Sequence, residues 1–258
     1  MTTEPDKSLV YLDWPEIVKK IRARTPARVL VGRSGAAYRT CTQMELRQAH
    51  AAARDAVRAE LDLEQQFGAA FKEQWGLFEV CTEANSKDEY LLRPNLGRTF
   101  SAASRSEILK RCSLRNDLQI AIGDGLSVTA ISAQVPALLP MLYDGAKARG
   151  WRVGQAFVIR HSRVGILNEI GELLTPNVAV LLIGERPGLA TAESLSAYMA
   201  YRPQRIHTDA NRNLISNIHA RGVSPYNAVM RILNLTAKMM KAESSGSQLK
   251  EEPPALEE

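Results

Sequence analysis

The sequence lacks a long apolar run, and this excludes a membrane-spanning helix. About 18 consecutive apolar residues are needed to cross a bilayer, whereas the most apolar run, VAVLLIG at residues 178–184, has seven. We interpret that run as a buried strand and expect no membrane association. The N-terminus, MTTEPDKSLVYLDW, also lacks a basic region followed by an apolar stretch, so we expect no secretory signal.

Cysteine is scarce as well. The three residues of this type, Cys41, Cys81 and Cys112, are odd in number and widely spaced. Such a set favours neither a disulfide framework nor a zinc site. A reducing, cytosolic type of compartment fits this cysteine content best.

Aromatic residues make up only 6% of the chain, and they do not alternate with basic residues as in RNA-binding proteins. The formal net charge is +5, but residues 242–258 contain five glutamates and one lysine, so residues 1–241 carry +9. The lysines and arginines of this basic body are scattered rather than gathered into runs. We therefore expect no nucleic-acid partner, and an acidic protein or a phosphate-bearing ligand suits the charge better.

The common signatures of enzymatic sites are also missing. After Gly123 and Gly125, Val128 stands where a dinucleotide-binding fingerprint needs its third glycine. The chain has no phosphate loop, no GxSxG nucleophile elbow and no metal-ligand spacing among its four histidines. The sequence thus predicts neither catalytic residues of its own nor a metal site.

The second half of the chain contains an alternation of strand and helix patterns. Apolar runs over residues 118–125, 153–160 and 178–188 lie about 30 residues apart and are separated by helical patterns. A last long helix is predicted from Pro225 onward. This alternation predicts an α/β fold with a Rossmann-like parallel sheet, which we place at residues 104–241.

The two ends of the chain differ from this domain. Residues 1–103 are predicted to be mostly helical, with Asp13 as the N-cap of a first helix that ends near Arg24. Residues 242–258 have low hydrophobicity, two adjacent prolines and like charges. We expect this last segment to be a disordered acidic tail.

The strongest local signal is the motif IGERPG at residues 183–188, which follows the most apolar strand pattern. Ligands of open α/β sheets bind at the carboxyl ends of the strands, and Glu185 and Arg186 stand at such an end. A carboxylate there can accept hydrogen bonds from the amide or hydroxyl groups of a ligand. The spacing equally allows a structural role, in which Glu185 and Arg186 form a pair that braces the turn.

Two further polar segments are candidates for the same region. RHSRVG at residues 160–165 leaves the end of a predicted strand, and TDANRNLISNIH at residues 208–219 is rich in Asp, Asn and Arg with little hydrophobic periodicity. Ordering such a segment is costly without partners. We expect residues 208–219 to form either a flexible loop or a contact with a polar ligand or another subunit.

Several motifs together resemble one family. IAIGDGLS, IRHSRVGILNEIGELL, LLIGERPGL, ESLSAYMAY and RNLISNIH, in this order, resemble the small (light) subunit of ethanolamine ammonia-lyase. The resemblance extends from about Leu12 to Lys241. It implies an enzyme that uses adenosylcobalamin to convert ethanolamine to acetaldehyde and ammonia. It also implies a hetero-oligomer whose large (heavy) subunit carries the substrate site and the catalytic side chains on a TIM barrel.

The resemblance further implies which residues of this chain contact the corrinoid at the interface with the large subunit. The matching positions are Val164, Glu185 and Leu214. Familiar members have cysteine at the position of Leu214, so here a thiol hydrogen bond is excluded and a backbone or apolar contact is expected. Glu185 can accept hydrogen bonds from the amide groups of the cofactor, and Val164 can supply an apolar wall.

One motif near the end of the chain resembles a cobalt-binding sequence. Asn217, His219 and Gly222 give NxHxxG, whereas many cobalamin proteins use the histidine of DxHxxG as a cobalt ligand. Asparagine cannot supply the carboxylate that orients such a histidine, and only 36 residues follow Gly222, too few for the usual corrinoid domain. We expect that His219 does not bind cobalt and that the cofactor keeps its own dimethylbenzimidazole as lower ligand.

Two other classes of function remain open from the residues alone. A stand-alone nucleotide- or cofactor-binding α/β enzyme would turn over substrate without a partner, and a basic scaffold or nucleic-acid-binding module would lose affinity steeply with salt. Some relatives are packed in bacterial microcompartments, which is therefore the expected location. The cytoplasm is the alternative, because only about a dozen residues precede Asp13.

Overall fold

The computed structural model describes residues 15–25, 29–188 and 191–249. The helices are α1 (Glu16–Ala23), α2 (Thr40–Arg58), α3 (Leu63–Phe67), α4 (Ala69–Gln74), α5 (Lys87–Leu92), α6 (Ala102–Arg111), α7 (Val128–Lys147), α8 (Ile166–Leu174) and α9 (Pro225–Ala242). The strands are β1 (Arg33–Ser34), β2 (Ala37–Tyr38), β3 (Glu79–Cys81), β4 (Leu118–Gly123), β5 (Phe157–Arg160), β6 (Val178–Gly184), β7 (Leu195–Tyr201) and β8 (Asn213–Ile218). Three short 3-10 helices are η1 (Leu96–Arg98), η2 (Asp209–Asn211) and η3 (Gly246–Gln248).

The centre of the molecule is a six-stranded sheet with the order β3-β5-β4-β6-β7-β8. The strands β3, β5, β4 and β6 run parallel, whereas β7 is antiparallel to both β6 and β8. The sheet is therefore mixed, where the sequence led us to expect a parallel one. The reason is the short connection after β6, because ten residues between Gly184 and Leu195 are too few for the helical crossover that a parallel neighbour needs.

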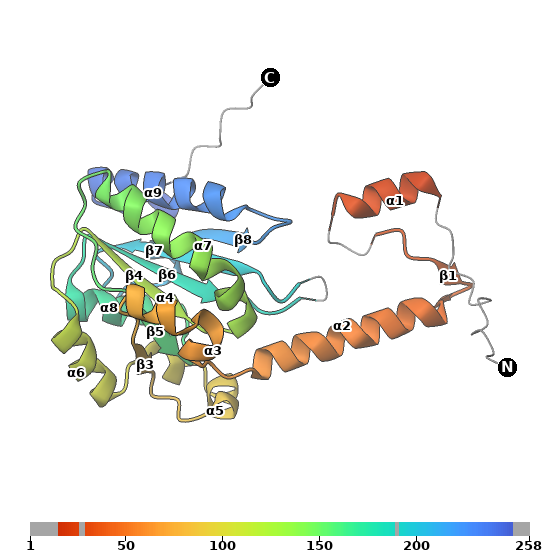
Figure 1. The fold of residues 1–258 in the computed structure, drawn as a ribbon, viewed down its shortest axis with the longest axis horizontal. Helices are drawn as coiled ribbons and strands as arrows, with labels where there is room; N and C mark the ends of the chain where they lie inside the picture. Colours follow the sequence, from red (N-terminus) through yellow and green to blue (C-terminus); the bar gives the residue numbers. More distant parts are fainter. Residues whose placement is uncertain (1–14, 26–28, 189–190, 250–258) are drawn as a thin grey trace, which may run out of the picture.

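Helices cover both faces of this sheet (Figure 1). Apolar side chains of α3, α4, α7 and α9 pack on one face, and those of α6 and α8 pack on the other. On the second face, among the described residues, β7 and β8 contribute only the half-buried Tyr198 to the apolar cluster. The part of that face formed by β7 and β8 is thus left without a covering helix.

The sheet crosses the domain boundary that we expected after residue 103. Strand β3 lies before that boundary and pairs with β5. At the other end, residues 243–249 belong to the fold, since the N–H of Gly246 donates to Asn213 Oδ1 at 2.6 Å and the N–H of Tyr201 donates to Ser245 Oγ at 3.0 Å. The rest of the expected tail, residues 250–258, lies outside the described residues, as does the expected N-cap Asp13.

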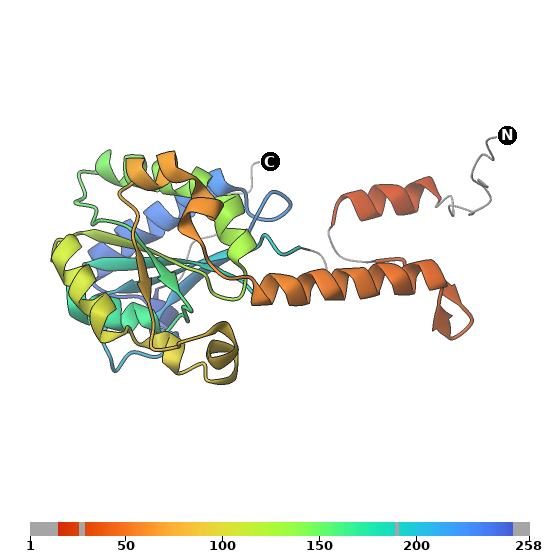
Figure 2. The same ribbon diagram turned by 60° about the horizontal axis from the view of Figure 1, so that its bottom comes forward.

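The first helices project from the α/β body as an arm (Figures 1 and 2). We use this name for the described residues 15–25 and 29–58. Helix α2 buries only Thr42 over its 19 residues, and α1 buries none of its own. Within the described parts of the chain, no helix is both long and apolar enough to span a bilayer.

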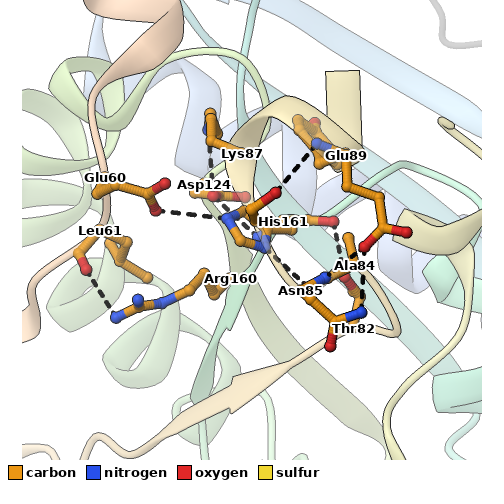
Figure 3. Close-up of polar contacts among 12 residues, drawn as sticks. Glu60, Leu61, Thr82, Ala84, Asn85, Lys87, Glu89, Asp124, Arg160 and His161 are labelled. Atoms are coloured by element: carbon orange, nitrogen blue, oxygen red, sulfur yellow. Dashed lines mark hydrogen bonds and ion pairs between the residues drawn. The ribbon is translucent and has the colours of Figure 1, made fainter. Parts of the chain in front are cut away.

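A buried carboxylate joins the loops at the carboxyl end of the sheet (Figure 3). Asp124 follows β4 and is fully buried. Its Oδ1 accepts the N–H of Ser162 at 2.8 Å, and its Oδ2 accepts the N–H of His161 at 2.9 Å. The Nζ of Lys87, whose side chain is only 6% exposed, lies 3.3 Å from Oδ2. One carboxylate therefore fixes the loops after β4 and β5 and the start of α5 together.

His161 extends this connection to the root of the arm. Its backbone has a φ of 59°, in the left-handed region that non-glycine residues seldom adopt. Its Nδ1 lies 3.1 Å from the carbonyl oxygen of Ala84, and its Nε2 lies 3.3 Å from Oε2 of Glu60 (Figure 3). Glu60 follows α2 by two residues, so the arm leaves the body next to the loop that Asp124 holds.

Replacing Asp124 with asparagine is expected to destabilise the protein strongly. The amide keeps the shape but leaves the buried Lys87 ammonium without its counter-ion. Removing one partner of a buried ion pair costs about 3–5 kcal/mol. A urea titration followed by circular dichroism measures this as a lower free energy of unfolding.

The matched control is Asp55→Asn on the exposed surface of α2, which should change the stability by less than about 0.5 kcal/mol. The double variant Asp124→Asn, Lys87→Met should recover part of the loss, because no unpaired ammonium then remains buried. Equal stabilities of Asp124→Asn and the control would show that Asp124 does not hold these loops.

Candidate functional site

A cavity of about 380 Å³ lies at the carboxyl ends of β4, β5 and β6 and extends over the open face of β7 and β8. Its lining residues are Tyr90, Gly125, Leu126, Ser162, Arg163, Val164, Ile183, Gly184, Glu185, Arg186, Ser196, Tyr198, Leu214 and Ser216. The structure thus brings together all three positions that the sequence resemblance assigned, Val164, Glu185 and Leu214. They reach the cavity from three different segments.

The carboxylate of Glu185 is held by hydrogen bonds from within the chain. Ser194 Oγ donates to Oε2 and Ser196 Oγ donates to Oε1, each at 2.6 Å. The backbone N–H of Asn217 donates to Oε1 at 2.9 Å. A carboxylate offers about four acceptor positions, so one position on Oε2 stays available to a ligand.

These contacts bear on the two roles that the sequence left open for Glu185. The carboxylate is braced, but by two serines of the β6–β7 hairpin and by β8. Arg186, the expected partner, is exposed and forms no ion pair with Glu185 in the described structure. Bracing and ligand binding are therefore compatible, because the brace leaves one acceptor position unused.

The two apolar candidates line the same cavity. Val164 follows β5 and is half-buried. Leu214 lies within β8, opposite Tyr198 of β7, and is 45% exposed because no helix covers this part of the sheet. Residues 208–219 form η2 and β8 rather than a flexible loop, and their contact with a polar ligand or another subunit stays a prediction.

Several polar atoms of the lining have no partner within the protein. Ser162 Oγ and Arg163 Nε are buried without a hydrogen bond. The Arg163 guanidinium lies over the ring of Tyr90, 4.2 Å from its centre. Burial raises the pKa of the Tyr198 hydroxyl, and the charge of Glu185 raises it further, so this group stays a neutral hydrogen-bond donor. The cavity is therefore lined by the Arg163 and Tyr198 side chains beside one carboxylate.

The NxHxxG motif forms a closed loop that supports Glu185. His219 is 3% exposed; its Nδ1 accepts the N–H of Arg221, so its Nε2 carries the proton that is donated to Asn217 Oδ1 at 2.7 Å. Asn217 has a φ of 62°, which directs its own N–H at Glu185. A Cβ on Gly222 would lie 2.2 Å from the carbonyl oxygen of Asn217, so glycine is required there. Both nitrogens of His219 are thus engaged inside the loop.

No metal site accompanies the cavity. Over the described residues, no three His, Cys, Asp or Glu side chains are placed to hold a metal ion. Cys41, Cys81 and Cys112 are free thiols.

Sequence reasoning gave no role to three residues that shape the cavity. Asp124 follows a buried strand directly, and an acidic residue at that position is a recognisable signal. Tyr90 and Tyr198 carry no such signal, since a lone tyrosine is unremarkable in sequence. Ser162 lies in the candidate segment RHSRVG but was not singled out there. The Tyr90 hydroxyl lies 2.9 Å and 2.8 Å from two loop carbonyl oxygens, contacts that only the fold creates.

Comparison with known proteins gives a consistent result. The family profile described as "Ethanolamine ammonia-lyase light chain (EutC)" matches residues 15–250. The ethanolamine ammonia-lyase small subunit of Clostridium perfringens is 40% identical over 252 residues, which cover 96% of this chain and 83% of the relative. The protein of the same name from Clostridium acetobutylicum is 38% identical over 91% of this chain and 95% of its own length.

A third relative of that name, from Lachnoclostridium phytofermentans, is 40% identical over 89% of this chain and 76% of its own length. Identities of this size over most of both chains confirm the resemblance found in the sequence motifs. The chain belongs to the ethanolamine ammonia-lyase light chain family and is a subunit of an ammonia-lyase.

Proposed function

We propose that this chain holds part of adenosylcobalamin at an interface with the large subunit of ethanolamine ammonia-lyase. One observation carries the proposal. Val164, Glu185 and Leu214, which the resemblance assigns to the corrinoid, lie far apart in the sequence but line a single cavity. That cavity lies at the end of the sheet where α/β proteins bind ligands.

The chemistry of the lining fits an amide-fringed corrinoid. Such a cofactor presents both donors and acceptors around an apolar ring. The free acceptor position of Glu185 suits an amide N–H, and the Tyr198 hydroxyl suits an amide carbonyl oxygen. Val164 and Leu214 supply apolar contact.

The residues of this chain bind and orient rather than react. Glu185 is pre-oriented by its serines, and the loop that carries Ser162 and Val164 is fixed by Asp124. A site that is rigid before binding loses little conformational entropy when the ligand arrives. When bound, adenosylcobalamin supplies the radical chemistry of the lyase reaction.

Two features support a partner subunit. The relatives are named small subunits, a name that presupposes a large one. The arm exposes large apolar side chains, with Ile17 63%, Leu30 51% and Met44 59% exposed. Exposed apolar side chains on a projecting arm suit contact with a partner if they form one patch.

Co-expression with the large subunit tests the proposed division of labour. The pair should deaminate ethanolamine only when adenosylcobalamin is added, and the purified chain alone should deaminate nothing with or without it. Acetaldehyde release measures both. Turnover by the chain alone would instead support a stand-alone cofactor-binding enzyme.

Glu185→Ala should weaken binding of adenosylcobalamin to the assembled enzyme. A hydrogen bond to a charged group contributes about 1.5–3 kcal/mol, which corresponds to about a 10- to 150-fold loss of affinity. The maximal rate at saturating cofactor should fall much less, because substrate chemistry lies on the partner. Titration of the corrin absorbance gives the affinity.

Two controls separate ligand binding from bracing at Glu185. Glu193→Ala removes an exposed carboxylate of the same hairpin and should leave the affinity unchanged. Ser194→Ala loosens the brace but keeps the carboxylate, so its effect on affinity should be the smaller. Loss of assembly with unchanged affinity in Glu185→Ala would reduce Glu185 to a structural brace.

His219 should contribute no nitrogen to cobalt, because both of its ring nitrogens are engaged by Asn217 and Arg221. Electron paramagnetic resonance of the Co(II) state reads the axial nitrogen directly. Uniform nitrogen-15 labelling of the protein, with unlabelled cofactor, should leave the three-line nitrogen-14 splitting. A two-line pattern would place a protein nitrogen on cobalt.

A further inference from the structure

A second cavity, of about 420 Å³, lies beside the candidate site on the side of α8. The chain passes from one cavity to the other at Val164 and Gly165, and again between Arg212 and Leu214. The charge of Arg212, in the lining of the second cavity, acts to lower the pKa of Tyr198 in the first, against the larger effect of burial. The two cavities are therefore neighbours on the same open part of the molecule.

The acidic groups of the second cavity are already engaged. Glu169 Oε1 accepts from Arg105 Nε, and its Oε2 accepts the N–H of Phe100, both at 2.5 Å. Asp209 pairs with Arg212, and Glu172 accepts the backbone N–H of Arg205 at 3.0 Å. The lining holds four arginines against three carboxylates, so a net positive charge remains.

Arg98 supplies part of that unbalanced charge. Its guanidinium forms no ion pair within the described structure, and it lines the cavity. Its side-chain stem lies over Gly165, where a Cβ would approach Arg98 Cγ and Cδ to 2.9 Å. This contact fixes the direction of the Arg98 side chain along the start of α8.

Arg212, whose charge is paired with Asp209, is the buried arginine of this cavity. Its side chain is 5% exposed, its Nη2 donates to Asn168 Oδ1 at 3.0 Å, and its Nε has no hydrogen-bond partner. Burial lowers the pKa of this guanidinium, Asp209 opposes this effect, and the charge of Arg98 adds to it. A buried N–H without a partner is costly unless an acceptor is bound.

The beginning of α8 adds to the same field. Gly165 occupies the N-cap position and offers no side-chain cap. A helix N-terminus carries a partial positive charge that favours anions. The only acidic residue of its first turn, Glu169, is neutralised by Arg105 as described.

We propose that Arg98 and Arg212, at the N-terminus of α8, bind a phosphate group. Resting on the proposed function, the phosphate is the phosphodiester in the nucleotide tail of cobalamin, which reaches the second cavity from the first. Two guanidinium groups suit a phosphodiester, whose two free oxygens share one negative charge. A free phosphate ion has the same chemistry and is separated by the experiment.

The experiment compares two corrinoids on the enzyme assembled with the large subunit. Cyanocobalamin carries the phosphodiester, whereas dicyanocobinamide lacks it together with the ribose and the base. Arg98→Ala should weaken the binding of cyanocobalamin about 10- to 100-fold and leave the binding of dicyanocobinamide unchanged. Arg98→Lys should show an intermediate loss, because it keeps the charge but not the planar fork.

Lys147→Ala is the matched control, since it removes one exposed positive charge at the C-terminus of α7, toward the amino ends of the parallel strands. This variant should change the affinity for neither cyanocobalamin nor dicyanocobinamide. Inorganic phosphate should compete with cyanocobalamin in the wild type and lose this effect in Arg98→Ala.

Three results would overturn the inference. Equal losses for both corrinoids in Arg98→Ala would mean that Arg98 acts on the ring or on the fold. No loss for either would remove Arg98 from the site. Competition by phosphate without any difference between the corrinoids would assign the site to a free ion. The proposed function fails separately, if neither corrinoid binds the assembled wild type.

Discussion

The side chain of Asp124 is the constraint on which the candidate site depends. A fully buried carboxylate is tolerated only when its charge and its acceptor positions are satisfied. Asp124 meets this requirement with two backbone N–H groups of the β5–α8 loop and the ammonium of Lys87. The same contacts that neutralise the charge therefore fix the wall of the cavity. The geometry of the site therefore follows from the need to compensate the charge of the buried Asp124 carboxylate.

Glu185, in a half-buried position, likewise joins several segments through one carboxylate. Its hydrogen bonds tie three pieces of chain together: the end of β6, the start of β7 and the end of β8. The NxHxxG loop continues that arrangement, because Asn217 serves Glu185 with its backbone and His219 with its side chain. A motif that resembles a cobalt-binding sequence thus has a structural explanation in this fold.

The buried strands were predictable, since β6 is apolar along its whole length, β4 is so except for Gln119, and no other element suits such short runs. β8 was not, because its exposed positions face an uncovered part of the sheet and remove the apolar signal. Proline disfavours the interior of a helix, yet α7 runs through Pro136 and Pro140, since packing against β4 and α9 outweighs the local preference. The Rossmann-like character of the parallel half stays a prediction.

The residues of the candidate site also divide into those that the sequence predicts and those that it does not. Glu185 was accessible from sequence, because a carboxylate after a buried strand has a defined place in α/β sheets. Val164 and Leu214 came from family resemblance alone, as neither side chain differs from an ordinary apolar residue. The Asp124–Lys87 pair joins residues 37 positions apart, and no local pattern records such a contact. Long-range polar partners are what the fold adds.

Helix α2 has a thermodynamic consequence for assembly. Its 19 residues span about 28 Å, and a helix with almost no buried residue draws its stability from intrinsic propensity, which is marginal in water. The helix–coil equilibrium of α2 is therefore governed by whatever surface covers it. Ordering of the arm and docking of a partner then form one coupled event. Glu60 links the root of α2 to His161, so ordering of the arm is coupled to the loop that Asp124 holds.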